Sequence, residues 1–266
     1  MIIFETDAEA TSADFHKIVA LPNGALAFIG SYVPANSNRF AGVVLAVDPN
    51  GRLNWTGASG DANAHVLFQS GAYDATTNTV IAVGRVTAGG DDGTCHNWSQ
   101  SFIQGFDAST GNLAAPQILG GPASSGPSSR RAFYDIAPTV SPRQYALIGF
   151  QSIQAESAQR CKDILQVGTL SLGPAAGDAS RWSAMWTGRA NGPPTGSEDG
   201  YALVSLGGNE YAVGGQIGDL AGTSLAHAVR FRLDPFAVQK TFNSPFPSLD
   251  AAQGAARFRA VTSYRD

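Results

Sequence analysis

Charged residues are scarce in this chain, and their scarcity excludes most helical folds. Asp, Glu, Lys and Arg together make up 14% of the 266 residues, against about 25% in an average soluble domain. Solvated helix faces are built largely from Lys and Glu, so this chain cannot be mostly surface helix. Apolar residues make up 43% and there are 31 glycines, which argues against disorder and supplies many turns. The composition favours an all-β protein.

Clusters of positive charge and long apolar runs are also missing. The formal net charge is −4 and the 17 basic residues are scattered, so we expect no binding to nucleic acid, which requires a dense basic surface. The longest apolar run falls far short of the roughly 20 residues of a membrane helix, and no membrane span is predicted. Residues 2–12, IIFETDAEATS, have no basic segment followed by an apolar one, so no signal peptide is predicted.

Cysteine is nearly absent, with only Cys95 and Cys161 in the chain. Both fall in loops between the second and third strands of neighbouring repeats, where a disulfide is geometrically reasonable. Two free thiols are the alternative, because the loop lengths leave the separation of the sulfur atoms undefined. A disulfide would indicate a periplasmic or secreted protein, whereas free thiols without a signal peptide would indicate the cytoplasm.

The sequence contains no motif for a nucleophile, a metal or a cofactor. G-x-S-x-G is absent, and no glycine-rich phosphate loop precedes a helix. The acidic segment GGDDG at 89–93 lacks the alternating oxygen ligands and the closing Glu of a calcium loop. The nearby Cys95 and His96 belong to no C-x-x-C or H-x-x-x-H spacing, which zinc sites use. We therefore predict no metal and no cofactor.

What the chain does contain is a repeat of about 55 to 65 residues. In each copy two apolar segments are joined by a turn, and the second ends in the glycine on which the copies align: Gly30, Gly84, Gly149 and Gly214. The turns are PNG (22–24), TTN (76–78), SPRQ (141–144) and GGN (207–209). A third strand follows, which ends at Asp48 in the first copy, and then a weaker fourth strand, which carries Trp55 in that copy.

Four strands per copy, joined by Gly, Pro, Asn and Asp turns, predict a meander. One meander cannot bury both of its faces alone, whereas identical units stacked around an axis bury them against their neighbours. A β-sandwich or two small barrels are the alternative, but neither requires a four-strand internal period. We predict an all-β fold, a β-propeller with four full four-stranded blades and a partial fifth.

The whole chain, 1–266, is predicted to form a single domain. Its four blades are expected at approximately 14–63, 64–125, 130–192 and 198–256. Residues 1–8 and 257–266 resemble an outer and an inner strand of an incomplete blade. Either the chain is a fragment of a longer propeller, which we favour, or its termini pair directly.

The repeats resemble those of bacterial β-propeller proteins. The features that carry the resemblance are the turn LPNG (21–24), the strand ending in Gly30, and D-x-x-G (48–51) before Trp55. The Kelch-like and PQQ-like repeat families are the most similar, over about residues 14–256. The resemblance implies that the first strand of each copy is innermost and the fourth outermost. The second and fourth copies lack the Trp and the third lacks the Asp, so no specific member is indicated.

The segments that lead into the first strands are polar and would converge on the axis of a propeller, where we expect a concave ligand site. They supply the candidate ligand-binding residues Asp14, His16, His65, Arg131, Tyr134, Asp135, Glu198, Asp199 and Arg257. The alternative is that these segments are polar simply because they are loops.

A non-enzymatic binding or interaction module is the favoured function, with a protein, a polar small molecule or a carbohydrate as its ligand. An enzyme acting on a polar small molecule or a carbohydrate at the channel mouth is one alternative, with His16, His65, Asp135 and Asp199 as acid–base candidates. A structural spacer in a larger exported protein is another. Fold does not choose among these functions, because propellers host all of them.

Overall fold

A computed structural model of the chain describes residues 10–35, 37–61, 63–87, 99–114, 117–119, 131–154, 161–173, 183–189, 196–219 and 224–243. Within these residues the elements are sixteen β-strands and one three-residue 3-10 helix, η1 (Pro22–Gly24). They fall into two compact units, β1–β8 in unit 1 and β9–β16 in unit 2. The single domain stays a prediction.

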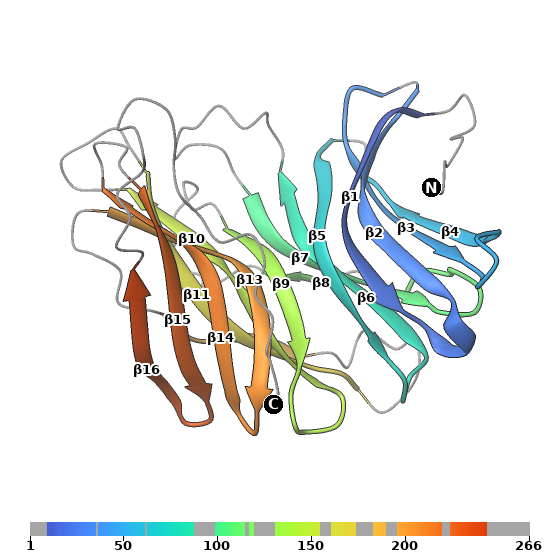
Figure 1. Cartoon of the computed structure of the whole chain (residues 1–266). Helices are drawn as coiled ribbons and strands as arrows, with labels where there is room; N and C mark the ends of the chain where they lie inside the picture. Colours follow the sequence, from blue (N-terminus) through green and yellow to red (C-terminus); the bar gives the residue numbers. More distant parts are fainter. Residues whose placement is uncertain are drawn as a thin grey trace. The chain divides into compact units, whose positions relative to one another are not determined.

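Unit 1 contains two four-stranded antiparallel sheets, coloured blue to green in Figure 1. The strand order is β1-β2-β3-β4 in the first sheet and β5-β6-β7-β8 in the second. The strands are β1 (Ala10–Ala20), β2 (Leu26–Pro34), β3 (Ala41–Val47), β4 (Leu53–Ser59), β5 (His65–Asp74), β6 (Thr79–Thr87), β7 (Ser99–Asp107) and β8 (Gln117–Leu119).

Unit 2 repeats this plan, coloured yellow-green to red in Figure 1. One sheet has the order β9-β10-β11-β12 and the other β13-β14-β15-β16. The strands are β9 (Arg131–Pro138), β10 (Gln144–Gln154), β11 (Cys161–Ser171), β12 (Ser183–Arg189), β13 (Gly196–Gly207), β14 (Glu210–Asp219), β15 (Ser224–Leu233) and β16 (Phe236–Asn243).

The two sheets of unit 1 pack face to face, with large rings of the second sheet set against glycines of the first. β5 packs against β1, β2 and β3. A Cβ atom on Gly42 would lie 2.5 Å from the Phe68 ring, and one on Gly57 would lie 2.5 Å from the Phe106 ring. Both rings are fully buried. The Phe68 N–H also donates a hydrogen bond to Ser31 Oγ at 3.1 Å, so a polar contact joins the sheets as well.

The two sheets of unit 2 are joined in the same manner. β13 packs against β9, β10 and β11. Buried Asp135 in β9 accepts a hydrogen bond at Oδ2 from the N–H of Leu203 in β13, at 2.8 Å. The hydroxyl of buried Tyr211 in β14 donates to the carbonyl oxygen of Pro138 at 3.4 Å, and its ring stacks on Phe231 with centroids 5.5 Å apart.

Four meander sheets, each with its first strand followed in order by the other three, are the blades of a β-propeller. In each unit the first strand of the second sheet packs on the sheet before it, as stacking of repeated units requires. The predicted fold class, an all-β propeller with four full four-stranded blades, is confirmed. The partial fifth blade, expected from 1–8 and 257–266, lies outside the described residues.

A β-bulge lies opposite the aligned glycine of each blade. In the first blade Phe15 pairs with Gly30 and Lys17 with Ile29, so His16 is an extra residue in β1. The extra residues of the other first strands are Gln69, Tyr134 and Tyr201. A Cβ on Gly30 would lie 2.0 Å from the carbonyl oxygen of Asp14, so only glycine fits against the bulge.

The fourth blade differs from the sequence alignment by one residue. Its bulge at Tyr201 separates the pair Gly200–Gly215 from the pair Ala202–Gly214. The residue equivalent to Gly30 is therefore Gly215, next to the Gly214 that the alignment selected.

The first strands begin earlier than the sequence indicated. The segments expected to be loops already lie in strands, since β1 begins at Ala10, β5 at His65, β9 at Arg131 and β13 at Gly196. The bulge is the physical reason, because one extra residue shifts the alternation of inward and outward side chains. The residues before each bulge therefore do not continue the pattern that identifies the strand after it.

Candidate functional site

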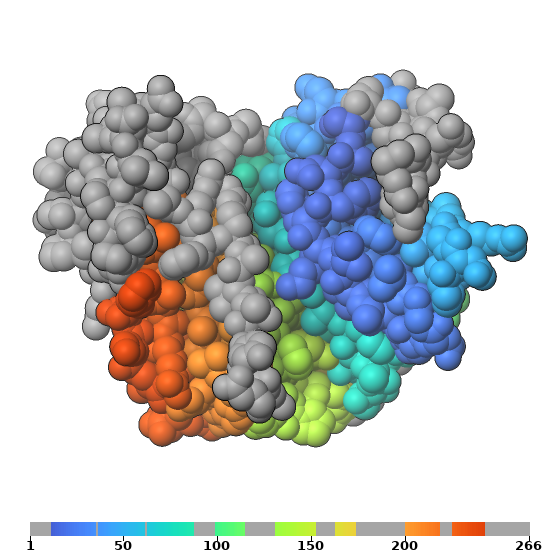
Figure 2. Space-filling model, in the orientation of Figure 1, coloured from blue at the N-terminus to red at the C-terminus, as the bar shows by residue number. Residues whose placement is uncertain are grey.

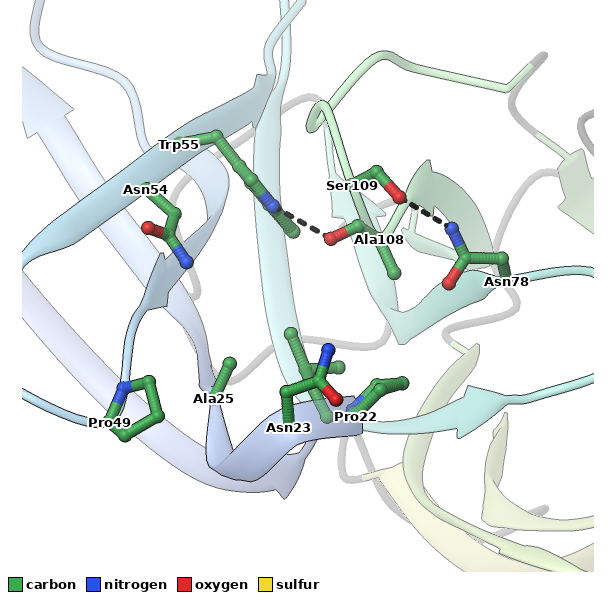
Figure 3. A pocket seen from close by; sticks show the side chains of 10 residues that line it. Pro22, Asn23, Ala25, Pro49, Asn54, Trp55, Asn78, Ala108 and Ser109 are labelled. Carbon is green, nitrogen blue, oxygen red and sulfur yellow. Dashed lines mark hydrogen bonds between the residues drawn. The ribbon is translucent and has the colours of Figure 1, made fainter.

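A pocket of about 410 Å³ lies in unit 1, where the turns β1–β2, β3–β4, β5–β6 and β7–β8 come together. The volume falls within the range of about 300–1,000 Å³ that is common for small-molecule sites. Figure 3 shows Trp55 and Asn54 on one side of it, Pro22 and Asn23 on a second side, and Asn78 with Ser109 on a third. Its lining residues are Leu21, Pro22, Asn23, Ala25, Pro49, Asn54, Trp55, Asn78, Ala108 and Ser109.

Two of these turns owe their shape to asparagines with a left-handed backbone. Asn23 in the β1–β2 turn has φ 60° and Asn78 in the β5–β6 turn has φ 50°. Asparagine tolerates this conformation better than most residues. The PNG and TTN segments that the sequence marks as turns therefore place an Asn at the pocket from each blade of unit 1.

The other two turns are held by an aspartate at the end of the third strand. Asp48 Oδ1 accepts hydrogen bonds from the N–H groups of Asn50 at 2.8 Å and Arg52 at 2.9 Å. These bonds, that from Arg52 first, lower the pKa of Asp48. The turn places Pro49 at the pocket, and Figure 2 shows this turn projecting from the surface at the right of the view.

Asp107 does the same for the turn after β7. Its Oδ1 accepts hydrogen bonds from the N–H groups of Ser109 and Thr110, both at 2.9 Å. The N–H of Ala108 donates to the carbonyl oxygen of Asn78 at 2.8 Å. The β5–β6 and β7–β8 turns are therefore tied together.

Trp55 joins the two blades of unit 1 on one side of the pocket. Its Nε1–H donates to the carbonyl oxygen of Ala108 at 2.9 Å, a bond drawn in Figure 3. The residue is only 8% exposed, and a Cβ on Gly111 would lie 2.6 Å from the indole. Gly111 has φ 73°, so two requirements select glycine there. The indole thus offers the pocket an apolar wall with its N–H already satisfied.

Asn23 and Asn54 supply amides that are available to a ligand. Both residues are exposed and line the pocket, and Figure 3 shows both side chains extending into the space between the turns. Among the described residues neither side-chain amide has a hydrogen-bond partner. Each offers one carbonyl acceptor and an NH₂ group with two donors.

Ser109 is oriented by a chain of hydrogen bonds that starts at Tyr73. The Tyr73 hydroxyl donates to Asn78 Oδ1 at 3.0 Å, and Asn78 Nδ2 donates to Ser109 Oγ at 2.8 Å. Burial, and secondarily the Asp74 carboxylate, raises the pKa of Tyr73, which keeps its hydroxyl protonated. Because Ser109 Oγ accepts from Asn78, its own O–H remains available as a donor.

The residues predicted for a ligand site lie at the start of the first strands. In β1 and β5 this is the end away from the turns that line the pocket. Asp14 and His16 share one face of β1, with 3.7 Å between Asp14 Oδ2 and His16 Nε2. The Asp14 side chain is 77% exposed, so the pair resembles a surface ion pair and contributes about 0–1 kcal/mol at most.

His65, the first residue of β5, contacts the preceding blade. Its Nδ1 accepts a hydrogen bond from the N–H of Phe40 at 3.2 Å, and the two rings lie 5.7 Å apart. Burial, followed by the charges of Arg39 and Arg85, lowers the pKa of His65. The neutral imidazole therefore fastens the loop before β3 to β5.

Three predicted residues come from β9. Arg131 is buried, and burial lowers the pKa of its guanidinium. Tyr134 is the bulge residue, and its ring lies 5.2 Å from Tyr201, the bulge residue of β13. Asp135 uses both carboxylate oxygens on backbone N–H groups, those of Ile136 at 2.9 Å and Leu203 at 2.8 Å. Through the bond to Leu203, Asp135 joins the two sheets of unit 2.

The remaining predictions fall where side chains are not described. Glu198 and Asp199 lie in β13, where their backbones pair with Ile217 and Gln216. Arg257 and Cys95 lie outside the described residues, and the side chain of Cys161 in β11 is not described either. The disulfide and this part of the ligand site stay predictions.

Within the part of the chain that the structure describes, no three His, Cys, Asp or Glu side chains gather as a metal site would require. No helix in those ranges has the length and apolar character needed to cross a membrane.

The pocket residues were missed because the sequence reasoning looked for titratable groups. The pocket wall is uncharged. Asn23 and Asn78 sit in turns, where backbone conformation alone explains them, and Asn54 lies at an exposed position of β4. The pair Asn54-Trp55, a polar residue beside an aromatic one in the fourth strand of the first blade, was the sequence feature that could have indicated the pocket.

The blades define the class of this protein as a β-propeller. No protein-family model and no curated protein sequence matches the chain. Among solved structures it is similar to the GH32 β-fructofuranosidase BmSUC1 of Bombyx mori, at 10% identity and a TM-score of 0.47, covering 87% of this chain and 49% of that one. It is similar to the WD40 domain of SCAP from fission yeast, at 9% identity and a TM-score of 0.35, covering 90% and 57%.

A third similar structure is BamB from Moraxella catarrhalis, at 11% identity and a TM-score of 0.26, covering 96% of this chain and 94% of that one. The chain spans about half the length of the first two structures. Because identity does not exceed 11%, these similarities say nothing about the ligand or the activity of this chain.

Proposed function

We propose that this protein is a non-enzymatic binding module that holds a polar ligand in the turn pocket of unit 1. The observation that carries the proposal is the pair of exposed amides of Asn23 and Asn54, which line the pocket and have no partner among the described residues. Amides at a concave surface are suited to fixing the orientation of a ligand.

The lining favours binding over catalysis. None of the ten lining residues is an acid, a base or a cysteine, and the hydroxyl of Ser109 accepts a hydrogen bond from an amide and not from a histidine. General acid–base chemistry needs a titratable group within reach of the reacting atoms. The pocket supplies contact groups without such a partner.

The enzyme and spacer alternatives differ in what they require. An enzyme at the channel mouth would use His16, His65, Asp135 and Asp199 as acid–base groups. Of these, Asp135 has both carboxylate oxygens occupied by backbone N–H groups. A spacer would leave the pocket without a ligand. The ligand site at the start of the first strands and membership of the Kelch-like or PQQ-like families stay predictions.

The test is a ligand screen read at the pocket. Neutral small molecules, sugars and short peptides are added to the ¹⁵N-labelled full chain, and the indole N–H signal of Trp55 is followed by NMR. The four tryptophans give four indole signals, and Trp55→Phe identifies the relevant one. We expect saturable shifts of that signal from at least one compound class.

The matched variant is Asn54→Trp, which places a large side chain in the pocket from an exposed position on β4. It should abolish those shifts while the protein stays folded. A screen in which no compound class moves the Trp55 signal would overturn the proposal.

A further inference from the structure

We infer that the turn pocket of unit 1 binds an uncharged, polyhydroxylated ligand, a mono- or disaccharide. The inference rests on the proposed function and identifies the ligand class of the same site. It follows from the charge of the lining, from the hydrogen-bonding groups left open, and from the apolar wall.

The neutral lining disfavours strongly ionic ligands. No lining residue carries a formal charge. A charged ligand would lose its hydration on entering the pocket and would find no opposite charge in the lining, so its desolvation free energy would not be offset. The desolvation of a neutral ligand with hydroxyl groups costs less free energy, because each hydroxyl replaces its hydrogen bonds to water with hydrogen bonds to neutral groups of the pocket.

The open polar groups match hydroxyls in kind. Asn23 and Asn54 each present an acceptor and donors. A sugar hydroxyl both donates and accepts, so two neighbouring hydroxyls can satisfy one amide through its oxygen and its nitrogen. Peptide groups also offer both functions, but they hold donor and acceptor on opposite sides and satisfy such an amide less completely.

Ser109 adds a hydroxyl group that lines the pocket. Its Oγ accepts from Asn78 Nδ2, and Asn78 is held in turn by the Tyr73 hydroxyl, so the Ser109 O–H remains available as a donor to a ligand oxygen. Because the two turns are tied through the Ala108 N–H and the Asn78 carbonyl, the Ser109 oxygen is held in position before the ligand binds. Preorganised donors lower the entropy lost on binding.

The apolar wall suits the carbon face of a sugar ring. It consists of Leu21, Pro22, Ala25, Pro49 and the indole of Trp55. Sugars carry hydroxyls at the ring edge and C–H groups on the ring faces, and aromatic or aliphatic surfaces pack on those faces. The polar groups of the pocket come from the same turns as this wall, so one small ring can contact both.

The experiment is an NMR titration of the full chain with neutral sugars and their charged analogues. Glucose, galactose, mannose, fructose, sucrose and maltose are compared with glucuronic acid and glucosamine, with the Trp55 indole N–H as the readout. With so few polar contacts we expect a Kd on the order of 1 mM for at least one neutral sugar, and weaker binding of its charged analogue.

Three substitutions locate the site. Asn54→Ala and Asn23→Gly should each lower the affinity by about 10-fold, the effect of one lost hydrogen bond. Glycine is chosen at Asn23 because φ there is 60°, which alanine adopts poorly. The control is Thr56→Ala, an exposed position on the same strand outside the lining, which should leave the affinity unchanged.

The outcomes separate this inference from the proposed function. If a peptide or another non-sugar compound shifts the Trp55 signal and no sugar does, the ligand class is wrong and the binding function stands. Tighter binding of the charged analogues likewise overturns the ligand class. If nothing shifts that signal, both are wrong.

Discussion

Gly84 lies against the backbone of the neighbouring strand so closely that a Cβ atom at its position would come within 1.9 Å of the carbonyl oxygen of Leu67. Gly149 has the same relationship to Ala132, also at 1.9 Å. In both blades the bulge in the first strand pushes the carbonyl into the space that a side chain would occupy. The aligned glycines of the repeat are therefore required by the β-bulges that lie opposite them in the first strands.

Gly84→Ala should therefore destabilise the protein strongly. The obstructing atom belongs to the backbone and cannot rotate away, so we expect a loss of about 3 kcal/mol or more in the free energy of unfolding. The control is Gly60→Ala, whose Cβ would meet only Ala41 Cβ at 3.5 Å, and which should change stability by less than about 0.5 kcal/mol. Urea denaturation measures both, and equal losses would refute the role of the bulge.

Asp135→Asn should destabilise unit 2 by about 1–3 kcal/mol, because one oxygen becomes an NH₂ group facing a buried N–H donor. Asp61→Asn is the matched change at an exposed aspartate whose Oδ1 accepts one bond, from Asn63 N–H at 2.7 Å, and which the amide oxygen can retain. We expect an effect below about 0.5 kcal/mol there. Chemical denaturation of both variants checks the difference, and an Asp135→Asn protein of unchanged stability would show that the carboxylate does not join the sheets.

His65 should make stability depend on pH. Its pKa in the folded protein is lowered, chiefly by burial, from the ordinary value of 6.5, so the unfolded chain takes up a proton more readily than the folded one. The free energy of unfolding should be constant well above pH 6.5 and should fall as the pH drops below it. Protonation also removes the Nδ1 acceptor of the Phe40 N–H.

The variant that isolates this effect is His65→Asn, which retains an acceptor but does not titrate. Denaturation of both proteins between about pH 8 and pH 5 gives the comparison. The gap between them should change only below about pH 6.5, and parallel profiles throughout would contradict the role of His65.

Trp55→Phe should lower the free energy of unfolding by about 1 kcal/mol, because the hydrogen bond to the Ala108 carbonyl is lost. The aromatic ring stays buried in this variant. Trp55→Ala should cost about 3–5 kcal/mol, since the indole fills the space between the two blades. Thermal unfolding of the two variants separates the two contributions. A phenylalanine variant as unstable as the alanine variant would mean that the hydrogen bond, and not packing, holds the blades together here.

The amino-acid sequence by itself determined the blade plan and the turns. The strand alternation that leads up to Gly30, Gly84 and Gly149 is a local pattern, and the left-handed conformation of Asn23 and Asn78 is a local preference. Such features depend on a few neighbouring residues, so they can be read without knowing what packs against them.

Tertiary structure alone decided where the first strands begin and where a pocket forms. The bulge at His16 interrupts the alternation, so the strand before it cannot be recognised from its pattern. The pocket draws on residues from Leu21 to Ser109, and only the stacking of two blades brings their turns together. Asp135 shows the same limit, because its hydrogen-bond partner Leu203 lies 68 residues away in the chain. The sequence alone does not distinguish an aspartate that accepts hydrogen bonds from backbone N–H groups from one that binds a ligand.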